Sequence, residues 1–177
     1  QIGDISLKEY KEDASQLFRG AKNTKVEIQY IRQGKSQTAT IILDEVEIKA
    51  VPFYALLKDN IGYIVLSKFT EKASSETKSA LLDLKKQGAT KVILDLRGNP
   101  GGLLHEAVNI CNLFVAKDEL IVTTKSKNPK HNHVYKTKNE PIDLEIPIAV
   151  IVDGKSASAS EIVAGAIQDL DRGVILG

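Results

Sequence analysis

Short apolar runs alternate along this chain with longer segments whose apolar residues recur every three or four positions. The runs at 63–69, 91–96 and 146–152 are rich in β-branched residues, as buried strands are. The segments that follow them have the period of a helix. Alternation of this kind over residues 60–177 predicts an α/β core whose central strands are mainly parallel.

Three helices are expected in this core. The first begins at Ser74 or Ser75 and ends at Gly88. Its inward face is expected to carry Leu81, Leu82 and Leu84. The second covers residues 103–115, and the third follows a serine-rich turn. Ser75 and Lys78 match the S-x-x-K pattern of β-lactamases, but the accompanying motifs are missing, so a helix cap is the simpler interpretation.

The N-terminal part of the chain has a pattern of its own. A capping box at 6–9, followed by an apolar stripe, predicts a helix that ends at Gly20. Residues 24–32 alternate like a strand, and a glycine turn leads to a second strand. We therefore expect two domains, a small α+β segment at 1–45 and the core at 46–177.

Composition and charge exclude several classes of protein. Of the 177 residues 42% are hydrophobic and 27% are charged, as in ordinary globular domains. The net charge is +1, which gives no broad attraction for nucleic acid, and no apolar run is long enough for a membrane span. Cys111 is expected in the core, and Glu45 and Glu47 in solvent. The chain starts at Gln1 without a methionine or a signal peptide, so we expect a piece of a longer polypeptide.

A serine triplet is the first candidate for chemistry. Ser156, Ser158 and Ser160 alternate with alanines where a predicted strand turns into a predicted helix. The start of a helix has free backbone N–H groups and a positive dipole end, so a hydroxyl there can be a nucleophile beside an oxyanion site. Ser158-x-x-Glu161 equally has the form of a capping box, which would make the serine structural.

A glycine-rich motif follows another predicted strand. Residues 95–102 read Asp-Leu-Arg-Gly-Asn-Pro-Gly-Gly, and helical spacing resumes after them. A glycine turn that opens a helix exposes several backbone N–H groups. The two glycine patterns typical of nucleotide-binding sites, G-x-x-x-x-G-K-[ST] and G-x-G-x-x-G, are both missing from the sequence. Asp95 and Arg97 are expected to pair with each other or with backbone groups.

The two motifs together resemble those of the carboxyl-terminal processing (tail-specific) proteases, the S41 family of serine peptidases. Their order and separation also fit, and the run at 61–69 resembles the first core strand of that family. The resemblance covers residues 51–177 strongly and the first fifty residues more loosely. It implies a crotonase-like core of ββα units, preceded by a partial PDZ-like segment in which the first half of a PDZ domain is missing.

The resemblance also implies a set of site residues. Ser158 would be the nucleophile, and the two flanking serines would be its structural neighbours. The oxyanion hole would be formed by the N–H of Ala159 and by that of Gly101 or Gly102. No cofactor and no metal is implied.

The general base of that family is a lysine about two dozen residues after the nucleophile, oriented by a glutamine one helical turn later. This chain ends at Gly177, nineteen residues after Ser158. We therefore expect the lysine and the glutamine to lie outside it, and the chain by itself to hydrolyse little or nothing. Lys155 is expected to be solvated. His105, near the glycine turn, is the other candidate base, although the family does not use it.

The function that the resemblance implies is that of a serine endopeptidase. It would cleave unfolded protein segments near their C-terminus through an acyl-enzyme, in the periplasm or at the cell envelope. The alternative is a non-catalytic S41-like module that binds peptides or apolar ligands, because a fold does not decide a function. An acyl-CoA enzyme of crotonase type is a third possibility, but such an enzyme needs no serine triplet.

Residues 126–132 are polar and contain Pro129, which predicts a surface loop or the tip of a hairpin between strands at 119–125 and 134–138. His131 and His133 lie in or beside this loop. Two histidines without a nearby cysteine or carboxylate are weak evidence for a metal site.

Overall fold

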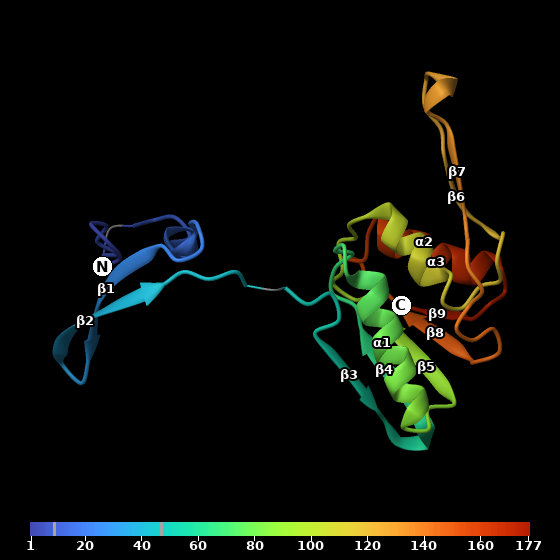
Figure 1. Cartoon of the computed structure of the whole chain (residues 1–177), viewed down its shortest axis with the longest axis horizontal. Coiled ribbons are helices and arrows are strands. Elements are labelled where there is room, and N and C mark those ends of the chain that lie inside the picture. Colours follow the sequence, from blue (N-terminus) through green and yellow to red (C-terminus); the bar gives the residue numbers. More distant parts are fainter. Residues whose placement is uncertain (9, 47) are drawn as a thin grey trace. The chain divides into compact units, whose positions relative to one another are not determined.

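The computed structural model describes residues 1–8, 10–46 and 48–177, which form two compact units, Gln1–Ile48 and Lys49–Gly177. Glu9, the last residue of the expected capping box, and Glu47, which we expected in solvent, lie outside the described residues. Figure 1 shows the elements of each unit.

The first unit is built around a β-hairpin. Strands β1 (Lys25–Arg32) and β2 (Lys35–Ile42) pair antiparallel in full register. Gln33 and Gly34 both have positive φ, as a two-residue hairpin turn of type I′ requires. The predicted hairpin is confirmed.

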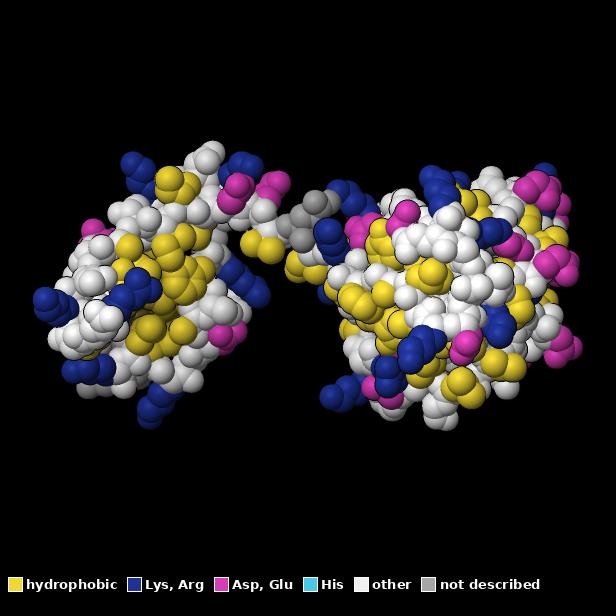
Figure 2. Space-filling model, turned by 90° about the horizontal axis from the view of Figure 1, so that it is seen from below, with side chains coloured by type: hydrophobic (Ala, Val, Ile, Leu, Met, Phe, Trp, Pro, Cys, Tyr) yellow, Lys and Arg dark blue, Asp and Glu magenta, His cyan; other side chains and the backbone are white. Residues whose placement is uncertain are grey.

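The prediction of a helix that ends at Gly20 is wrong in both the length and the type of the helix. Only a short 3₁₀ helix, η1 (Ala14–Phe18), forms, and the Asp13 carboxylate caps it by accepting from the Ser15 N–H. Leu7 and Phe18 of the apolar stripe remain exposed, and helices in proteins depend on the packing of such a stripe. Figure 2 shows hydrophobic side chains gathered on one face of this unit.

The second unit contains a five-stranded mixed sheet in the order β3-β4-β5-β8-β9. Its strands are β3 (Phe53–Leu56), β4 (Ile61–Val65), β5 (Lys91–Asp95), β8 (Ile148–Ile151) and β9 (Val174–Leu176). A short 3₁₀ helix, η2 (Lys58–Asn60), leads from β3 to β4, which are antiparallel, and the other neighbours are parallel. The predicted α/β core with mainly parallel central strands is confirmed.

Three helices connect the parallel strands: α1 (Ala73–Lys86), α2 (Leu104–Cys111) and α3 (Ala159–Asp169). The parallel strands follow one another in chain order, so right-handed crossovers place successive helices on the same face of the sheet. Accordingly α2 packs against both α1 and α3 (Figure 1).

The core lies between the sheet and these helices. Ile64, Leu94 and Val150 are in register across β4, β5 and β8, and all three are buried. Helical side chains complete the layer, and the fully buried ones include Leu81, Leu84, Ile110 and Ile167. Truncation of such a residue to alanine typically costs about 2–5 kcal/mol.

The first core helix differs from its prediction at its start and on one face. It begins at Ala73, and its N-cap is Lys72 rather than Ser74 or Ser75. Leu82 is 38% exposed because the buried stripe runs along Ala73, Thr77, Ala80, Leu81 and Leu84. Its predicted end is confirmed, since Gly88 has a φ of 100° just after the C-cap. The second core helix ends at Cys111, four residues earlier than predicted, and is followed by turns.

The predicted polar tip belongs to a second hairpin, formed by β6 (Leu120–Thr124) and β7 (His133–Lys136). A 3₁₀ helix, η3 (Pro129–His131), forms its tip. Figure 1 shows this hairpin projecting from the body of the unit. Among the described residues no helix combines the length and apolarity needed to cross a bilayer.

Candidate active site

Two loops meet at one edge of the sheet. The glycine loop (residues 96–103) follows β5, and the serine loop (residues 152–158) follows β8. Because β5 and β8 are parallel neighbours, their carboxyl ends lie side by side, and ligand sites of open α/β sheets lie at this edge. The fold thus brings the two sequence motifs together.

Ser158 has an unusual backbone conformation. It stands at the N-cap of α3 with φ 56° and ψ −111°. An ordinary N-cap residue has extended φ and ψ, so capping alone does not require this conformation. Positive φ costs a residue other than glycine about 1–2 kcal/mol. Strain of this kind concentrates at functional sites, and a sharp strand-to-helix turn is how many hydrolases expose a nucleophilic serine.

Ser158 also takes part in a helix cap. Ser158 and Glu161 are placed as a capping box, and the Ser158 N–H donates to the Glu161 carboxylate. This bond stabilises the start of α3 and occupies the Ser158 N–H. The capping interpretation of the serine motif therefore has a real counterpart in the structure.

Gly101 is packed against the backbone of the serine loop. It has a φ of 96°, and a Cβ at this position would lie 2.6 Å from the Ala157 carbonyl oxygen and 2.9 Å from the Ala159 nitrogen. Those atoms belong to the backbone and cannot rotate away. Glycine is therefore required here for the two loops to approach one another.

The two glycines differ in how their N–H groups are used. The Gly101 N–H donates to Asn99 Oδ1 at 2.9 Å, while the Gly101 carbonyl accepts from the Phe69 N–H at 3.1 Å. In a trans peptide the next N–H, that of Gly102, points the opposite way from this carbonyl. Within the described part of the chain, the N–H groups of Gly102 and Ala159 have no hydrogen-bond acceptor. These two N–H groups are free to donate, whereas that of Gly101 is occupied.

Asn99 holds three segments together. It is fully buried, and its Nδ2 donates to the Leu66 carbonyl, after β4, at 2.8 Å. Its Oδ1 accepts from Gly101, as described. Its carbonyl oxygen accepts from the Ala157 N–H at 3.1 Å and from the Ser160 hydroxyl at 3.0 Å. One side chain and one peptide unit thus fix the glycine loop to both neighbouring strand ends.

Ser156 and Asp153 make a second connection between the loops. The Ser156 hydroxyl donates to the Leu96 carbonyl at 2.8 Å. The Asp153 carboxylate accepts from the Gly98 N–H and the Lys155 N–H, both at 2.9 Å. These hydrogen bonds, first of all that from Gly98, lower the pKa of Asp153. The outer serines of the triplet, Ser156 and Ser160, therefore bind the glycine loop, one on each side of Ser158.

A buried carboxylate supports the start of the glycine loop. Asp95 accepts four hydrogen bonds from Arg97, one from its backbone N–H and three from its guanidinium, the shortest at 2.6 Å. It accepts another from the Tyr63 hydroxyl. Burial acts to raise the pKa of Asp95, but the bonds from Arg97 and Tyr63 outweigh it and hold that pKa below its ordinary value. The expected pairing of Asp95 with Arg97 is confirmed.

Among the described residues, the other candidate bases make no hydrogen bond with Ser158. The His105 side chain is 63% exposed, and its Nε2 lies 3.7 Å from the buried Glu106 carboxylate. Lys155 is exposed in the turn. His131 and His133 are exposed, and in the described ranges no group of three or more potential ligands could hold a metal ion.

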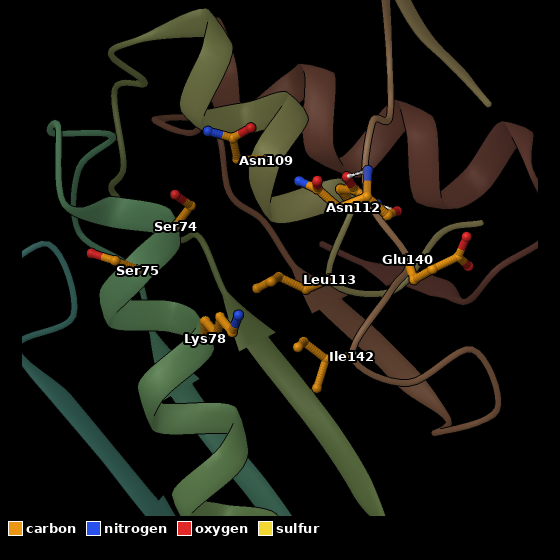
Figure 3. A pocket seen from close by; sticks show the side chains of 9 residues that line it. Ser74, Ser75, Lys78, Asn109, Asn112, Leu113, Glu140 and Ile142 are labelled. Atoms are coloured by element: carbon orange, nitrogen blue, oxygen red, sulfur yellow. Dashed lines mark hydrogen bonds between the residues drawn. The ribbon is translucent and has the colours of Figure 1, made fainter. Parts of the chain in front are cut away.

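The S-x-x-K match does not form a serine–lysine pair. The Ser75 hydroxyl donates to the Lys72 carbonyl at 2.9 Å, so Ser75 does not cap α1 either. Figure 3 shows the Ser75 and Lys78 side chains pointing apart at a pocket of about 330 Å³ between α1 and α2. The pattern is incidental to the helix.

Asn99 and Asp153 were not singled out by sequence reasoning. Asparagine beside proline and aspartate before glycine are ordinary turn residues, and a turn is all that their local sequence predicts. Their hydrogen bonds join segments that are far apart in the chain, so no local signal could have identified them.

The edge of the sheet therefore presents a serine in a strained helix-start conformation with free N–H donors close by, the arrangement of hydrolases that use a serine nucleophile. Residues 60–177 match the model of peptidase family S41, and the chain belongs to this family.

Relatives and solved structures agree with this assignment. The chain is 36% identical over 171 residues to a carboxyl-terminal-processing protease of Synechocystis, covering 94% of this chain and 39% of that protein. It is 35% identical over 161 residues to a probable CtpA-like serine protease of Staphylococcus saprophyticus, covering 90% and 32%. The chain thus spans about a third of the length of these relatives.

The fold resembles that of a photosystem II D1 C-terminal processing protease, with a TM-score of 0.61 and 28% identity over 91% of this chain and 45% of that one. A putative S41 protease from Bacteroides fragilis has a TM-score of 0.64 at 17% identity, covering 85% and 46%, and shows the same fold.

Proposed function

We propose that this chain is part of a serine endopeptidase that cleaves protein substrates near their C-terminus. Membership of family S41 and the similarity to carboxyl-terminal-processing proteases support a protease. The observation that carries the proposal is the conformation of Ser158 at the start of α3. Its positive φ is strained, and a helix cap does not require it. The finer fold in this proposal is a crotonase-like core preceded by a PDZ-like segment.

In the proposed reaction the Ser158 hydroxyl attacks the carbonyl carbon of the scissile peptide. The carbonyl oxygen becomes an oxyanion, which the N–H groups of Ala159 and Gly102 stabilise. One such donor typically contributes about 10²–10³-fold to kcat. Collapse of the tetrahedral intermediate releases the amine and leaves an acyl-enzyme, which water then hydrolyses.

The proposal assigns the second donor to Gly102 rather than Gly101. The Gly101 N–H would have to leave Asn99 before it could bind an oxyanion, and that would leave the buried Asn99 oxygen without its donor. Gly101 instead lets the glycine loop approach the serine loop.

A serine hydroxyl needs a base to take its proton. We propose a lysine, oriented by a glutamine, that the family resemblance places about two dozen residues after Ser158 in a longer chain. A lysine serves as a base at neutral pH only when burial or a neighbouring charge lowers its pKa. Lys155 is exposed, which makes it unsuitable for this role.

The test is labelling by a fluorophosphonate, combined with cleavage of an unfolded protein by the longer chain. We expect labelling and cleavage that Ser158→Ala abolishes. Ser75→Ala is the matched control, because Ser75 is an exposed serine on α1 and lies outside the two loops. Equal labelling of the Ser158→Ala variant would refute Ser158 as the nucleophile.

The second candidate function is a non-catalytic peptide-binding module. The capping contact between Ser158 and Glu161 favours it, since a cap gives this serine a purely structural use. No labelling and no cleavage by the longer chain, with retained peptide binding, would decide for this alternative.

A further inference from the structure

A pocket of about 320 Å³ lies between α2 and strand β7, and the proposed reaction does not use it. Val108 and Asn112 are its buried floor, and Val134, 63% exposed, stands at its hairpin side. The floor is anchored to the hairpin, because Asn112 Oδ1 accepts from the Lys138 N–H at 3.0 Å. The pocket is therefore part of the folded unit.

Two lysines give the walls of this pocket a positive charge. Lys136 and Lys138 come from the hairpin side, His133 lies on β7, and His105 lies in the first turn of α2. None of the residues that line the pocket is Asp or Glu. The hairpin segment 120–138 itself contains five lysines and no acidic residue. Charges of one sign gathered around a concave surface raise the local potential for a ligand of the opposite sign.

The carboxylate of Glu106, next to His105 in the chain, is already hydrogen-bonded elsewhere. Glu106 is buried and accepts from the Ser74 N–H of α1 at 2.6 Å and from Asn109 Nδ2 at 3.1 Å. It faces His105 at 3.7 Å but pairs with neither lysine. Over residues 1–8, 10–46 and 48–177, Lys136 and Lys138 have no ion pair with an acidic side chain. Their charges remain available to a ligand.

The pocket begins close to the proposed oxyanion hole. His105 follows Gly102 by three residues, and α2 then leads along the pocket to Asn112. Seven residues of helix span about 10 Å, and an extended peptide covers that length with about three residues. A substrate held at Ser158 could therefore lay the neighbouring part of its chain along this pocket.

We propose that this pocket is a subsite for a carboxylate-bearing segment of an unfolded protein. The carboxylate comes from an Asp or Glu side chain or from the substrate's C-terminus. That the ligand is a substrate rests on the proposed function, but binding to the pocket does not require cleavage.

The experiment measures the binding of fluorescent, unstructured peptides to the full chain by fluorescence anisotropy. One peptide carries glutamates, a second carries glutamines in their place, and each is made with a free and an amidated C-terminus. The test variant is Lys136→Ala/Lys138→Ala. The matched control is Lys127→Ala/Lys130→Ala, which removes the same charge at or near the tip of the same hairpin.

We expect the glutamate peptide to bind more tightly than the glutamine peptide. The test variant should lower the affinity for the glutamate peptide roughly fivefold, as the loss of two partly exposed ion pairs can. The control variant should change this affinity less than twofold. Val134→Trp, which fills the pocket without changing charge, should also weaken binding. If only the peptide with a free C-terminus depends on the lysines, the carboxylate is terminal; if amidation has no effect, it is a side chain.

Three results would overturn the proposal: equal binding of all four peptides, equal loss in the test and control variants, or an unchanged affinity in Val134→Trp. A labelling failure at Ser158 with lysine-dependent binding intact would reject the protease and keep the subsite. The two proposals can thus fail separately.

Discussion

Asn99 is expected to hold the candidate active site in shape. The variant Asn99→Ala removes both side-chain hydrogen bonds, those with the Leu66 carbonyl and the Gly101 N–H. Both partners lie at a buried position, so they remain without hydrogen bonds after the substitution. Each such group costs about 1–3 kcal/mol, and the two together about 4 kcal/mol of unfolding free energy.

The assay is urea unfolding followed by circular dichroism at 222 nm. The three α-helices of the described chain all lie in the second unit, so this signal reports on that unit. For a domain of this size the loss corresponds to a decrease in Tm of roughly 15 °C. Asn109→Ala is the control, because Asn109 is exposed and its side chain makes one hydrogen bond, to Glu106. It should cost less than about 1 kcal/mol.

A second readout separates positioning from stability. At a temperature where Asn99→Ala is folded, the longer chain should react with a fluorophosphonate about 10²-fold more slowly, because a misplacement of 1 Å at a reacting centre has an effect of this size. A loss of stability no larger than that of Asn109→Ala would refute the reasoning. So would a full labelling rate, since the loops would then keep their geometry without Asn99.

Two further predictions concern the same loops. Gly101→Ala should destabilise the unit by about 3 kcal/mol through its positive φ and its contacts with the Ala157 and Ala159 backbone, whereas Gly154→Ala, which meets no atom within 4 Å, should stay within about 0.5 kcal/mol. Equal unfolding free energies of these two variants would contradict the close approach of the loops. Acid should also destabilise the unit: the pKa values of Asp95 and Asp153 are lowered on folding, so their stabilisation is present above the unfolded pKa of about 4 and is lost as pH falls through the folded values. The Tm of Asp153→Asn, measured between about pH 5 and 2, should fall less steeply with decreasing pH than that of the unsubstituted chain. Parallel curves of Tm against pH would show that the Asp153 carboxylate does not contribute to the acid sensitivity of the unit.

Much of the core could be predicted from local pattern. The buried strands β4, β5 and β8 are short β-branched runs, and all three helices of the core start or stop where the sequence places a glycine or a serine turn. The prediction of an N-terminal helix is wrong because an apolar stripe stabilises a helix only when it packs against other parts of the protein. Leu7 and Phe18 of this stripe stay exposed. The prediction that Leu82 faces inward is wrong for a related reason, because Leu82 lies beside the buried stripe of α1.

The sequence by itself determined that two motifs follow two strands, that a serine stands at a helix start, and which family these motifs resemble. Only the tertiary structure decided that β5 and β8 are neighbours, because strand order depends on long-range pairing and not on local pattern. That pairing brings the outer serines against the glycine loop. The tertiary structure also decides which glycine keeps a free N–H, because the Asn99 side chain is anchored at the Leu66 carbonyl and accepts from the Gly101 N–H.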